Sequence, residues 1–452
     1  MPFSLRSSLC SLLLLWPAPV WGHARLLRSE PSSGSSAESP RFIRLWFSER
    51  PEVRLTAVTL RNEGGAMLSV LDPRSEAGNP LQVSFAIASA LPPGQYTAEW
   101  RTVSSDGHPS HGRFAFTVLA APSPTTVQAP ASASSFSPAT ATAAKDSAQS
   151  VDSASPGNSL SRGVSFAGIL LIVGVIVFNL LVVARSARIP GELVWRMESR
   201  AAVVGVSASM LTIMAGFSRM FFEARMIRAM PGMDATTMQS VLMGTAWGAA
   251  MRIQIIAAFL AMIAFAIAIK RIRGAWLIAS LAGAILAATP ALSGHAAAAT
   301  HLSSVLIATD FIHVVGASSW LGNLACVMFI GVPILFRAGG EDRWQSIAAL
   351  VNTFSAVALA SAVIVVLSGV IATWIHLEHF SSLWLTTYGK VLLLKLALVM
   401  VTILTGAYNF RRVQPALVHE EGTTRLRRST ALELSTAALI VLVTGFLTGI
   451  AP

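Results

Sequence analysis

The sequence predicts two structural regions in one chain, an all-β sandwich followed by an α-helical polytopic membrane bundle of about eight spans. Runs that alternate between apolar and polar residues fill residues 23–119, and turn residues separate them. The later part carries apolar segments long enough to cross a bilayer, for which about 20 residues are needed. Of the 452 residues only 12% are charged, and the mean hydropathy is +0.62. Soluble proteins carry about 25% charged residues, so most of this chain is expected in lipid.

Residues 1–22 have the layout of a secretory signal peptide. Arg6 precedes a leucine-rich apolar run, and Val20 and Gly22 are acceptable at the positions before a cleavage site. We expect cleavage after Gly22, which makes His23 the first residue of the mature chain. An α-amine and an imidazole on one residue close a chelate on a single metal ion, and this pair of ligands suits Cu(II).

Five stretches of residues 23–119 alternate between apolar and polar side chains, as strands with one buried face do. They are residues 41–47, 54–60, 81–85, 95–100 and 113–118. Turn signals such as Asp72-Pro73 and Pro92-Pro93-Gly94 separate some of them. About 100 residues suffice for one core, so we expect a small Ig/cupredoxin-like sandwich of two packed sheets.

Residues 120–162 consist almost entirely of alanine, serine, proline and threonine. This composition buries too little apolar surface to offset the entropy of ordering, so we expect a disordered linker. The linker would tether the sandwich to the membrane region of residues 163–452.

Eight apolar segments after residue 163 are predicted to span the membrane. They are residues 164–184, 201–221, 249–269, 275–292, 305–336, 347–374, 391–410 and 432–450. Basic residues gather in alternate loops, around Arg185, Arg271 and Arg411, which the positive-inside rule assigns to the cytoplasm. The net charge of +11 therefore indicates orientation rather than nucleic-acid binding, and it places the sandwich outside. One group of basic residues is an exception in a predicted outer loop: Arg219, Arg225 and Arg228.

The outer domain has two further metal-ligating side chains in the segment from Ser104 to Pro109. Asp106 and His108 are two residues apart, so both side chains point the same way if the segment is extended. With the two nitrogens of His23 they give a near-planar set of three nitrogens and one oxygen, which suits Cu(II). The alternative interpretation of the same residues is a polar Asp-Gly turn without a ligand.

This domain resembles the periplasmic copper-binding CopC family. The residues that carry the resemblance are His23-Ala24, Ser29-Glu30-Pro31, Leu45-Trp46-Phe47-Ser48-Glu49, Gly94-Gln95-Tyr96-Thr97-Ala98-Glu99-Trp100, Ser104 to His108, and Gly112-Arg113-Phe114-Ala115-Phe116. The resemblance implies a Cu(II) site formed by His23, Asp106 and His108. Some members have a second, methionine-rich Cu(I) site, which we expect to be absent because Met67 is the only methionine of the domain. His111 is an additional candidate ligand.

In the membrane region, Asp310 and His313 are three residues apart on one helical face. A carboxylate deep in lipid costs roughly 2.5–3.5 kcal/mol on insertion scales, so it is rarely without a role. One interpretation is the outer mouth of a copper path. Three further histidines lie at predicted outer ends: His295, His376 and His379. The other interpretation is a structural ion pair of Asp310 with Lys395 or Arg252.

This region resembles the CopD family of copper-transport membrane proteins. The residues that carry the resemblance are Ser293-Gly294-His295-Ala296, Asp310-Phe311-Ile312-His313, Trp320-Leu321-Gly322, Thr387-Tyr388-Gly389-Lys390, Lys395, Asn409, Arg411 and Gly449-Ile450-Ala451-Pro452. Fusion of the two domains in one chain also occurs among relatives. The chain is therefore expected to be a CopC–CopD fusion of the copper resistance and copper transport family.

Methionines cluster between the second and third predicted spans. Met226, Met230 and Met233 lie in a stretch that contains Pro231-Gly232 and has the character of a loop. Thioethers are soft ligands that select Cu(I), so these residues are candidate Cu(I) ligands. The alternative is ordinary packing, because methionine also fills gaps in cores.

The leading functional hypothesis is a copper-binding protein of the bacterial inner membrane. The sandwich captures Cu(II) in the periplasm and passes copper to the membrane region for import, homeostasis and resistance, with periplasmic copper proteins as further partners. The sequence contains no nucleotide-binding loop, so we do not expect ATP-driven transport by this chain, and we expect no enzymatic activity. Two alternatives remain open: a membrane redox protein with haem or copper, and a copper buffer or sensor without translocation.

Overall fold

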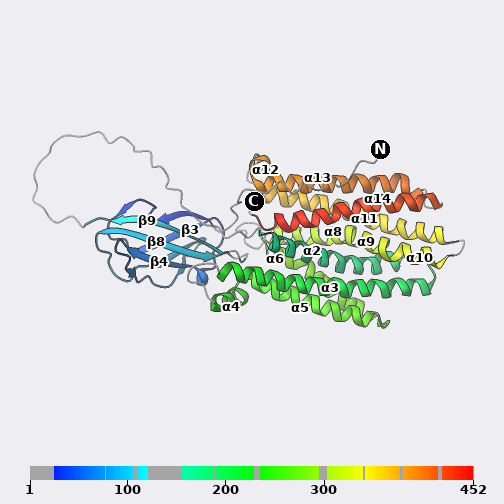
Figure 1. The fold of residues 1–452 in the computed structure, drawn as a ribbon, viewed down its shortest axis with the longest axis horizontal. Coiled ribbons are helices and arrows are strands. Elements are labelled where there is room, and N and C mark those ends of the chain that lie inside the picture. The colour runs from blue at the N-terminus through cyan, green and yellow to red at the C-terminus, as the bar shows by residue number, and fades with distance from the viewer. Residues whose placement is uncertain are drawn as a thin grey trace, which may run out of the picture.

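The computed structural model describes residues 25–120 and 155–450, apart from short segments inside these ranges. Those segments are residues 77, 105–106, 108, 187–188, 229–234, 295–302, 340–341, 377–379 and 416–419. A β-rich domain lies at one end of an elongated helical bundle, next to α4 (Ala235–Gly244) and the end of α3 (Gly191–Arg228) (Figure 1). The predicted signal peptide lies outside the described residues.

The β-rich domain is a sandwich of two sheets, as predicted. One sheet has the strand order β1-β3-β7-β6 and the other has the order β2-β9-β8-β4-β5. The strands are β1 (Leu26–Glu30), β2 (Ser36–Ala37), β3 (Phe42–Phe47), β4 (Ala57–Asn62), β5 (Met67–Leu68), β6 (Arg74–Glu76), β7 (Asn79–Ala86), β8 (Gly94–Val103) and β9 (Pro109–Val118). Four of the five predicted stretches correspond to β3, β7, β8 and β9.

The predicted strand at residues 54–60 is correct only in its second part. A 3-10 turn, η1 (Val53–Leu55), precedes β4, and the Thr56 N–H donates to the Val53 carbonyl at 3.1 Å. Because this turn uses the Thr56 N–H, the ladder to β8 begins at Ala57.

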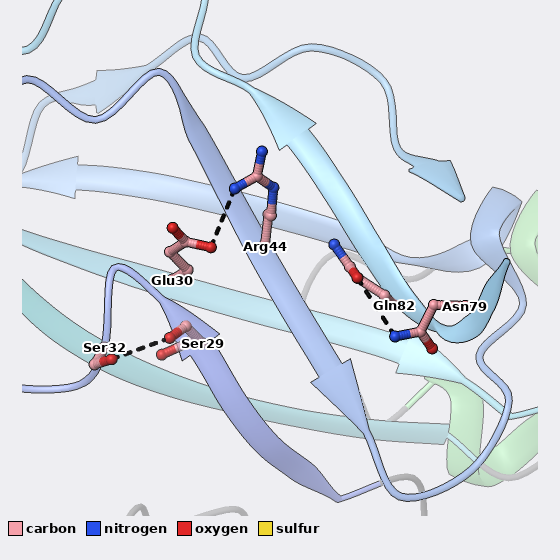
Figure 2. A network of polar contacts seen from close by, with 6 residues as sticks. All are labelled: Ser29, Glu30, Ser32, Arg44, Asn79 and Gln82. Carbon is pink, nitrogen blue, oxygen red and sulfur yellow. Dashed lines mark hydrogen bonds and ion pairs between the residues drawn. The ribbon is translucent and has the colours of Figure 1, made fainter. Parts of the chain in front are cut away.

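Side chains from both sheets form the sandwich core. Phe47 and Trp100 meet edge to face with their ring centroids 5.4 Å apart. Buried aromatic pairs of this geometry contribute about 0.5–1.5 kcal/mol beyond the area that they bury. On the opposite face of the four-stranded sheet, Glu30 and Arg44 pair across β1 and β3 at 3.1 Å (Figure 2). Both side chains are partly exposed, so this ion pair adds little stability.

Within the described residues, eight helical segments are long and apolar enough to cross a membrane, as predicted. The first four are α2 (Pro156–Val177) with η2 (Phe178–Val183), α3, α5 (Ala246–Ala268) and α6 (Gly274–Leu292). The fifth comprises α8 (Ser303–Ala317), η3 (Ser318–Gly322), α9 (Asn323–Cys326), η4 (Val327–Gly331) and α10 (Val332–Ala338). The last three are α11 (Arg343–His376), α13 (Thr387–Tyr408) with η5 (Asn409–Val413), and α14 (Glu420–Leu447). A short helix, α12 (Ser382–Leu385), precedes α13.

The first helix begins earlier than the sequence indicates. Residues 156–162 were expected in the linker, but they form the first turns of α2. Ser155 is the N-cap, and its hydroxyl oxygen accepts from the Asn158 N–H at 3.4 Å. Pro156 stands at the helix start, where its fixed φ favours the helix and its missing N–H costs nothing. The rest of the predicted linker, residues 121–154, lies outside the described residues.

The three arginines that opposed the predicted orientation belong to a helix rather than a loop. Arg219, Arg225 and Arg228 lie on the last turns of α3. Arg219 interacts electrostatically with Glu223, one turn further along α3, and with Arg162 of α2. Glu223 and Arg162 are both buried, so Arg219 belongs to an internal charge cluster. Arg219 is therefore held inside the protein and carries no information about membrane orientation, whereas Arg225 and Arg228 are exposed and remain an exception to the predicted orientation.

Candidate functional site

The segment from Ser104 to Pro109 connects β8 to β9 and forms a turn. The Gly107 N–H donates to the Ser104 carbonyl at 2.8 Å, and Gly107 has a φ of +90°, in the left-handed region that favours glycine. The expectation of an extended segment is therefore wrong at Gly107, because the chain must reverse between two antiparallel strands. Asp106 and His108 flank Gly107, but their own placement lies outside the described residues, as does that of His23.

This turn packs directly against the membrane region. Gly107 is buried, and a Cβ added to it would lie only 2.7 Å from Cγ of Trp247, near the start of α5. Val103, the last residue of β8, and Leu55 of η1 belong to one apolar cluster with Trp247. Val103 and Trp247 are both buried. The predicted copper-binding turn is therefore part of the contact between the two domains, and glycine at position 107 permits the close approach.

A cleft of about 1080 Å³ lies beside this contact. Glu52 and Arg50 line it from the sandwich, and Ser240 and Met243 line it from α4. Burial raises the pKa of the Glu52 carboxyl above its ordinary range, and the positive charge of Arg50 opposes this rise. Polar side chains therefore line a cleft next to the apolar contact between the two domains.

His111 lies on β9, opposite Arg101 of β8 in the ladder. Its Nδ1 atom is buried and has no hydrogen-bond partner among the described residues. Buried ring nitrogens normally have a partner, so His111 remains a candidate ligand, three residues beyond His108. The structure does not describe the side chains that would complete a site with it.

Asp310 and His313 both lie on α8, as predicted, and they have different neighbours. His313 Nδ1 lies 3.0 Å from Oγ of Ser368 on α11. Asp310 interacts electrostatically with Lys395 and with Tyr388, both on α13. The ion-pair interpretation of Asp310 thus has support, with Lys395 as the partner.

The other basic candidate, Arg252, does not serve as that partner. Its guanidinium donates to the Leu242 carbonyl and to the Met243 sulfur, at the start of α5. Arg252 therefore stabilises the junction of α4 and α5 instead.

The predicted outer mouth is described only in part. His295 and His379 lie outside the described residues, and His376 ends α11 with a side chain that the structure does not describe. Among the described residues, no group of three histidine, cysteine, aspartate or glutamate side chains is arranged to hold a metal ion. Asp310 and His313 thus have no third ligand of these types in the described part of the chain.

The methionine-rich stretch is helical rather than loop-like where it is described. Met226 is buried near the end of α3, while Met230 and Met233 lie outside the described residues. Two further methionines of the stretch lie on α4: Met238 and Met243. The loop expectation was wrong for these residues because α3 continues to Arg228, well beyond its apolar part.

Three methionines lie at the domain contact, of which only Met238 belongs to the methionine-rich stretch that the sequence indicated as a source of Cu(I) ligands. Met220 of α3, Met238 of α4 and Met251 of α5 pack with Trp247, Val103 and Leu55. Met251 follows Trp247 by one helical turn, and this spacing is the one signal in the sequence that links the two residues.

A small two-sheet sandwich followed by eight membrane-type helices, with its candidate ligand turn held against those helices, defines a membrane protein with an attached β-sandwich domain. Comparison with known families identifies both parts. Residues 26–119 match the CopC domain, residues 153–303 match the N-terminal domain of copper resistance protein D-like proteins, and residues 348–447 match copper resistance protein D.

Individual relatives cover the same regions. The copper transport protein CutJ of Bacillus subtilis (strain 168) is 25% identical over 412 residues, which are 88% of this chain and 69% of CutJ. Copper resistance protein D of Pseudomonas syringae pv. tomato is 28% identical over 315 residues, 65% of this chain and 97% of that protein. Protein YobA of Escherichia coli (strain K12) is 31% identical over 117 residues, 25% of this chain and 94% of YobA. The chain belongs to the copper resistance and copper transport family, with CopC and CopD domains in one polypeptide.

Proposed function

We propose that this protein is a copper carrier of the bacterial inner membrane, without enzymatic activity. The sandwich captures Cu(II) in the periplasm through His23, Asp106 and His108, and it passes copper to the membrane domain for import, homeostasis and resistance. The contact of Gly107 with Trp247 carries this proposal, because it holds the copper-binding turn against the membrane domain. A copper buffer that does not deliver its ion has no need for this contact.

The distribution of charge supports the proposed orientation. The sandwich lies at one end of the bundle, and the turn with Lys270, Arg271 and Arg273 follows the C-terminal end of α5, at the opposite end (Figure 1). Basic residues next to spans favour the cytoplasmic side. A sandwich at the other end is then periplasmic, where Cu(II) is available to a secreted metal site.

Copper that enters a methionine-containing part of the membrane domain does so as Cu(I). Each Cu(II) ion then takes up one electron, which we assign to small thiols outside the membrane. Two thiols give one disulfide, two protons and two electrons, so they reduce two cupric ions. This chain supplies the ligands for both oxidation states.

Copper uptake by proteoliposomes tests the proposal. Gly107→Ala places a methyl group against Trp247, so we expect about tenfold slower uptake, the ratio that 1.4 kcal/mol of lost contact produces. Gly65→Ala is the matched control, because Gly65 has a similar φ of +81° and open space around its Cβ position. Equal uptake by the wild type and Gly107→Ala would show that the domain contact has no part in transport.

A further inference from the structure

Three methionines from three different helices belong to one apolar cluster next to the turn that contains Gly107. Met220 comes from α3, Met238 from α4 and Met251 from α5, and all three belong to the apolar cluster that contains Trp247. Met251 is completely buried. Val103 of the sandwich belongs to the same cluster.

The composition of the cluster distinguishes it from ordinary packing. Three of its nine residues are methionines. The main core of the helical bundle, which is several times larger, contains only two methionines, Met197 and Met328. Alanine, isoleucine, valine and leucine fill space in that core, so space-filling alone does not explain methionines at the domain contact.

We propose that Met220, Met238 and Met251 form a binding site for a soft monovalent cation, namely Cu(I). This inference rests on the proposed function, for which it names the first acceptor in the membrane domain. Thioether sulfur is uncharged and polarizable, so it binds Cu(I) without adding a buried negative charge. Hard cations such as Na⁺ and Ca²⁺ require oxygen ligands and gain too little from sulfur to leave water in this apolar setting.

Buried polar side chains continue from this site into the membrane domain. Gln254 follows Met251 on α5, and its side-chain amide donates to Oγ of Ser165 on α2 at 2.8 Å. The hydroxyls of Ser161 on α2 and Ser218 on α3 are 2.7 Å apart. These groups lie between α2, α3 and α5, so a cation that leaves the methionines meets polar atoms before it meets lipid.

The test measures Cu(I) binding by the full chain in detergent, with Cu(I) presented as its coloured bicinchoninate complex. All proteins carry His108→Ala, which removes a ligand of the outer site. We expect Met220→Leu/Met238→Leu/Met251→Leu to lower Cu(I) affinity at least a hundredfold. Methionine-to-leucine exchanges nearly conserve volume and each usually costs under about 1.5 kcal/mol, and a thermal melt identifies the folded variants.

The matched control removes three methionines whose side chains are exposed on the bundle surface: Met210 (57%), Met214 (60%) and Met400 (55%). Replacement of these three by leucine should leave Cu(I) affinity unchanged. If the cluster variant and the control bind Cu(I) equally, the proposed site is wrong. If the triple cluster variant unfolds at a lower temperature than the control, the Cu(I) affinities of the three single methionine-to-leucine variants are compared with that of the control instead.

Failure of this site is distinguishable from failure of the proposed function. If Gly107→Ala slows uptake while the cluster variant keeps its Cu(I) affinity, the proposed function is supported and the proposed acceptor site is wrong. If the cluster variant binds Cu(I) more weakly while Gly107→Ala leaves uptake unchanged, the Cu(I) site is supported and the proposed transport role is wrong.

Discussion

Two regions of the membrane domain differ in chemistry and in their relation to the sandwich. At the ends of α3, α4 and α5, an apolar surface with Trp247 and Met251 contacts the turn that contains Gly107. Within α8, α11 and α13, the polar groups of Asp310, His313 and Lys395 interact with one another or with nearby hydroxyls. The residues of the first region that contact the sandwich are apolar, although Arg219 and the buried Glu223 lie on the same end of α3, whereas the interactions of the second region involve charged groups.

The difference shows that the residues in contact with the sandwich are not the ionisable residues of the spans. Ionisable residues in a span are costly, so they attract attention in a sequence. The turn that contains Gly107 nevertheless contacts a surface of tryptophan and methionine, which appear in the sequence as ordinary apolar residues. In the proposed function, the region around Asp310 serves either a later stage of copper passage or the architecture of the bundle, and experiments can separate these roles.

The largest effect is expected at the Asp310–Lys395 pair. Asp310→Ala leaves Lys395 without its opposite charge in a membrane-spanning helix, which costs about 2.5–3.5 kcal/mol on insertion scales. The measurement is the unfolding temperature of the full chain in detergent. Asp310→Asn/Lys395→Met removes both charges and should recover most of the lost stability. If this stable double variant also transports copper at the normal rate, the pair is purely structural and only the methionine side serves transport.

His108→Ala should abolish most Cu(II) binding by the sandwich. Loss of an outer-shell partner of a metal already costs about 10–100-fold in affinity, and loss of a direct ligand should exceed that range. Competition with a Cu(II) chelator measures the affinity. His111→Ala should have a smaller effect and His313→Ala none, because His313 lies in the other region. Unchanged affinity in His108→Ala would contradict the assignment of the turn as the Cu(II) site.

Gly107→Ala should separate the two domains without removing a ligand. A side chain at a positive φ costs about 1–2 kcal/mol, and the added methyl also meets Trp247. Quenching of Trp247 emission by Cu(II) in the sandwich reports the contact, with Trp247→Phe as the blank. We expect about tenfold less docked protein, while Gly65→Ala reports the backbone cost alone. Equal quenching in the wild type and Gly107→Ala would show that Gly107 does not determine the contact between the sandwich and the membrane domain.

The smallest effect is expected at Glu52, beside the domain contact. Burial raises the pKa of this carboxyl, so its contribution to stability is present below pH 4.5, its ordinary value, and is lost as pH rises through the raised value. Glu52→Gln should therefore raise the unfolding temperature at pH 8 and leave it unchanged at pH 4. Glu76→Gln, an exposed residue on the same cleft, should change neither value. A Glu52→Gln variant that is less stable at pH 8 would contradict this assignment.

The regular parts of the fold follow from the sequence because their patterns are local. All eight spans were predicted from apolar length, and the long strands β3, β7, β8 and β9 from alternation. The strands β2, β5 and β6 have only two or three residues, and β6 is exposed throughout. Such short segments carry too little pattern, since their pairing partners make them strands.

The residue types of the candidate site are visible in the sequence, but their arrangement is not. The Asp-Gly-His turn is visible in the sequence, whereas its shape depends on the reversal at Gly107 and on contact with Trp247, 140 residues later. Lys395 was one of two candidate partners of Asp310, and only the packing of α13 distinguishes it from Arg252. Met251 was missed because its neighbours Met220 and Met238 come from other helices.

The length of α3 has a consequence for how the protein sits in its surroundings. Its 38 residues extend over about 57 Å at 1.5 Å per residue, nearly twice the roughly 30 Å of a hydrocarbon core. Part of the helix therefore lies outside the hydrocarbon core. We expect the copper transfer proposed above to take place in this part of the protein, so bilayer thickness should have little influence on it.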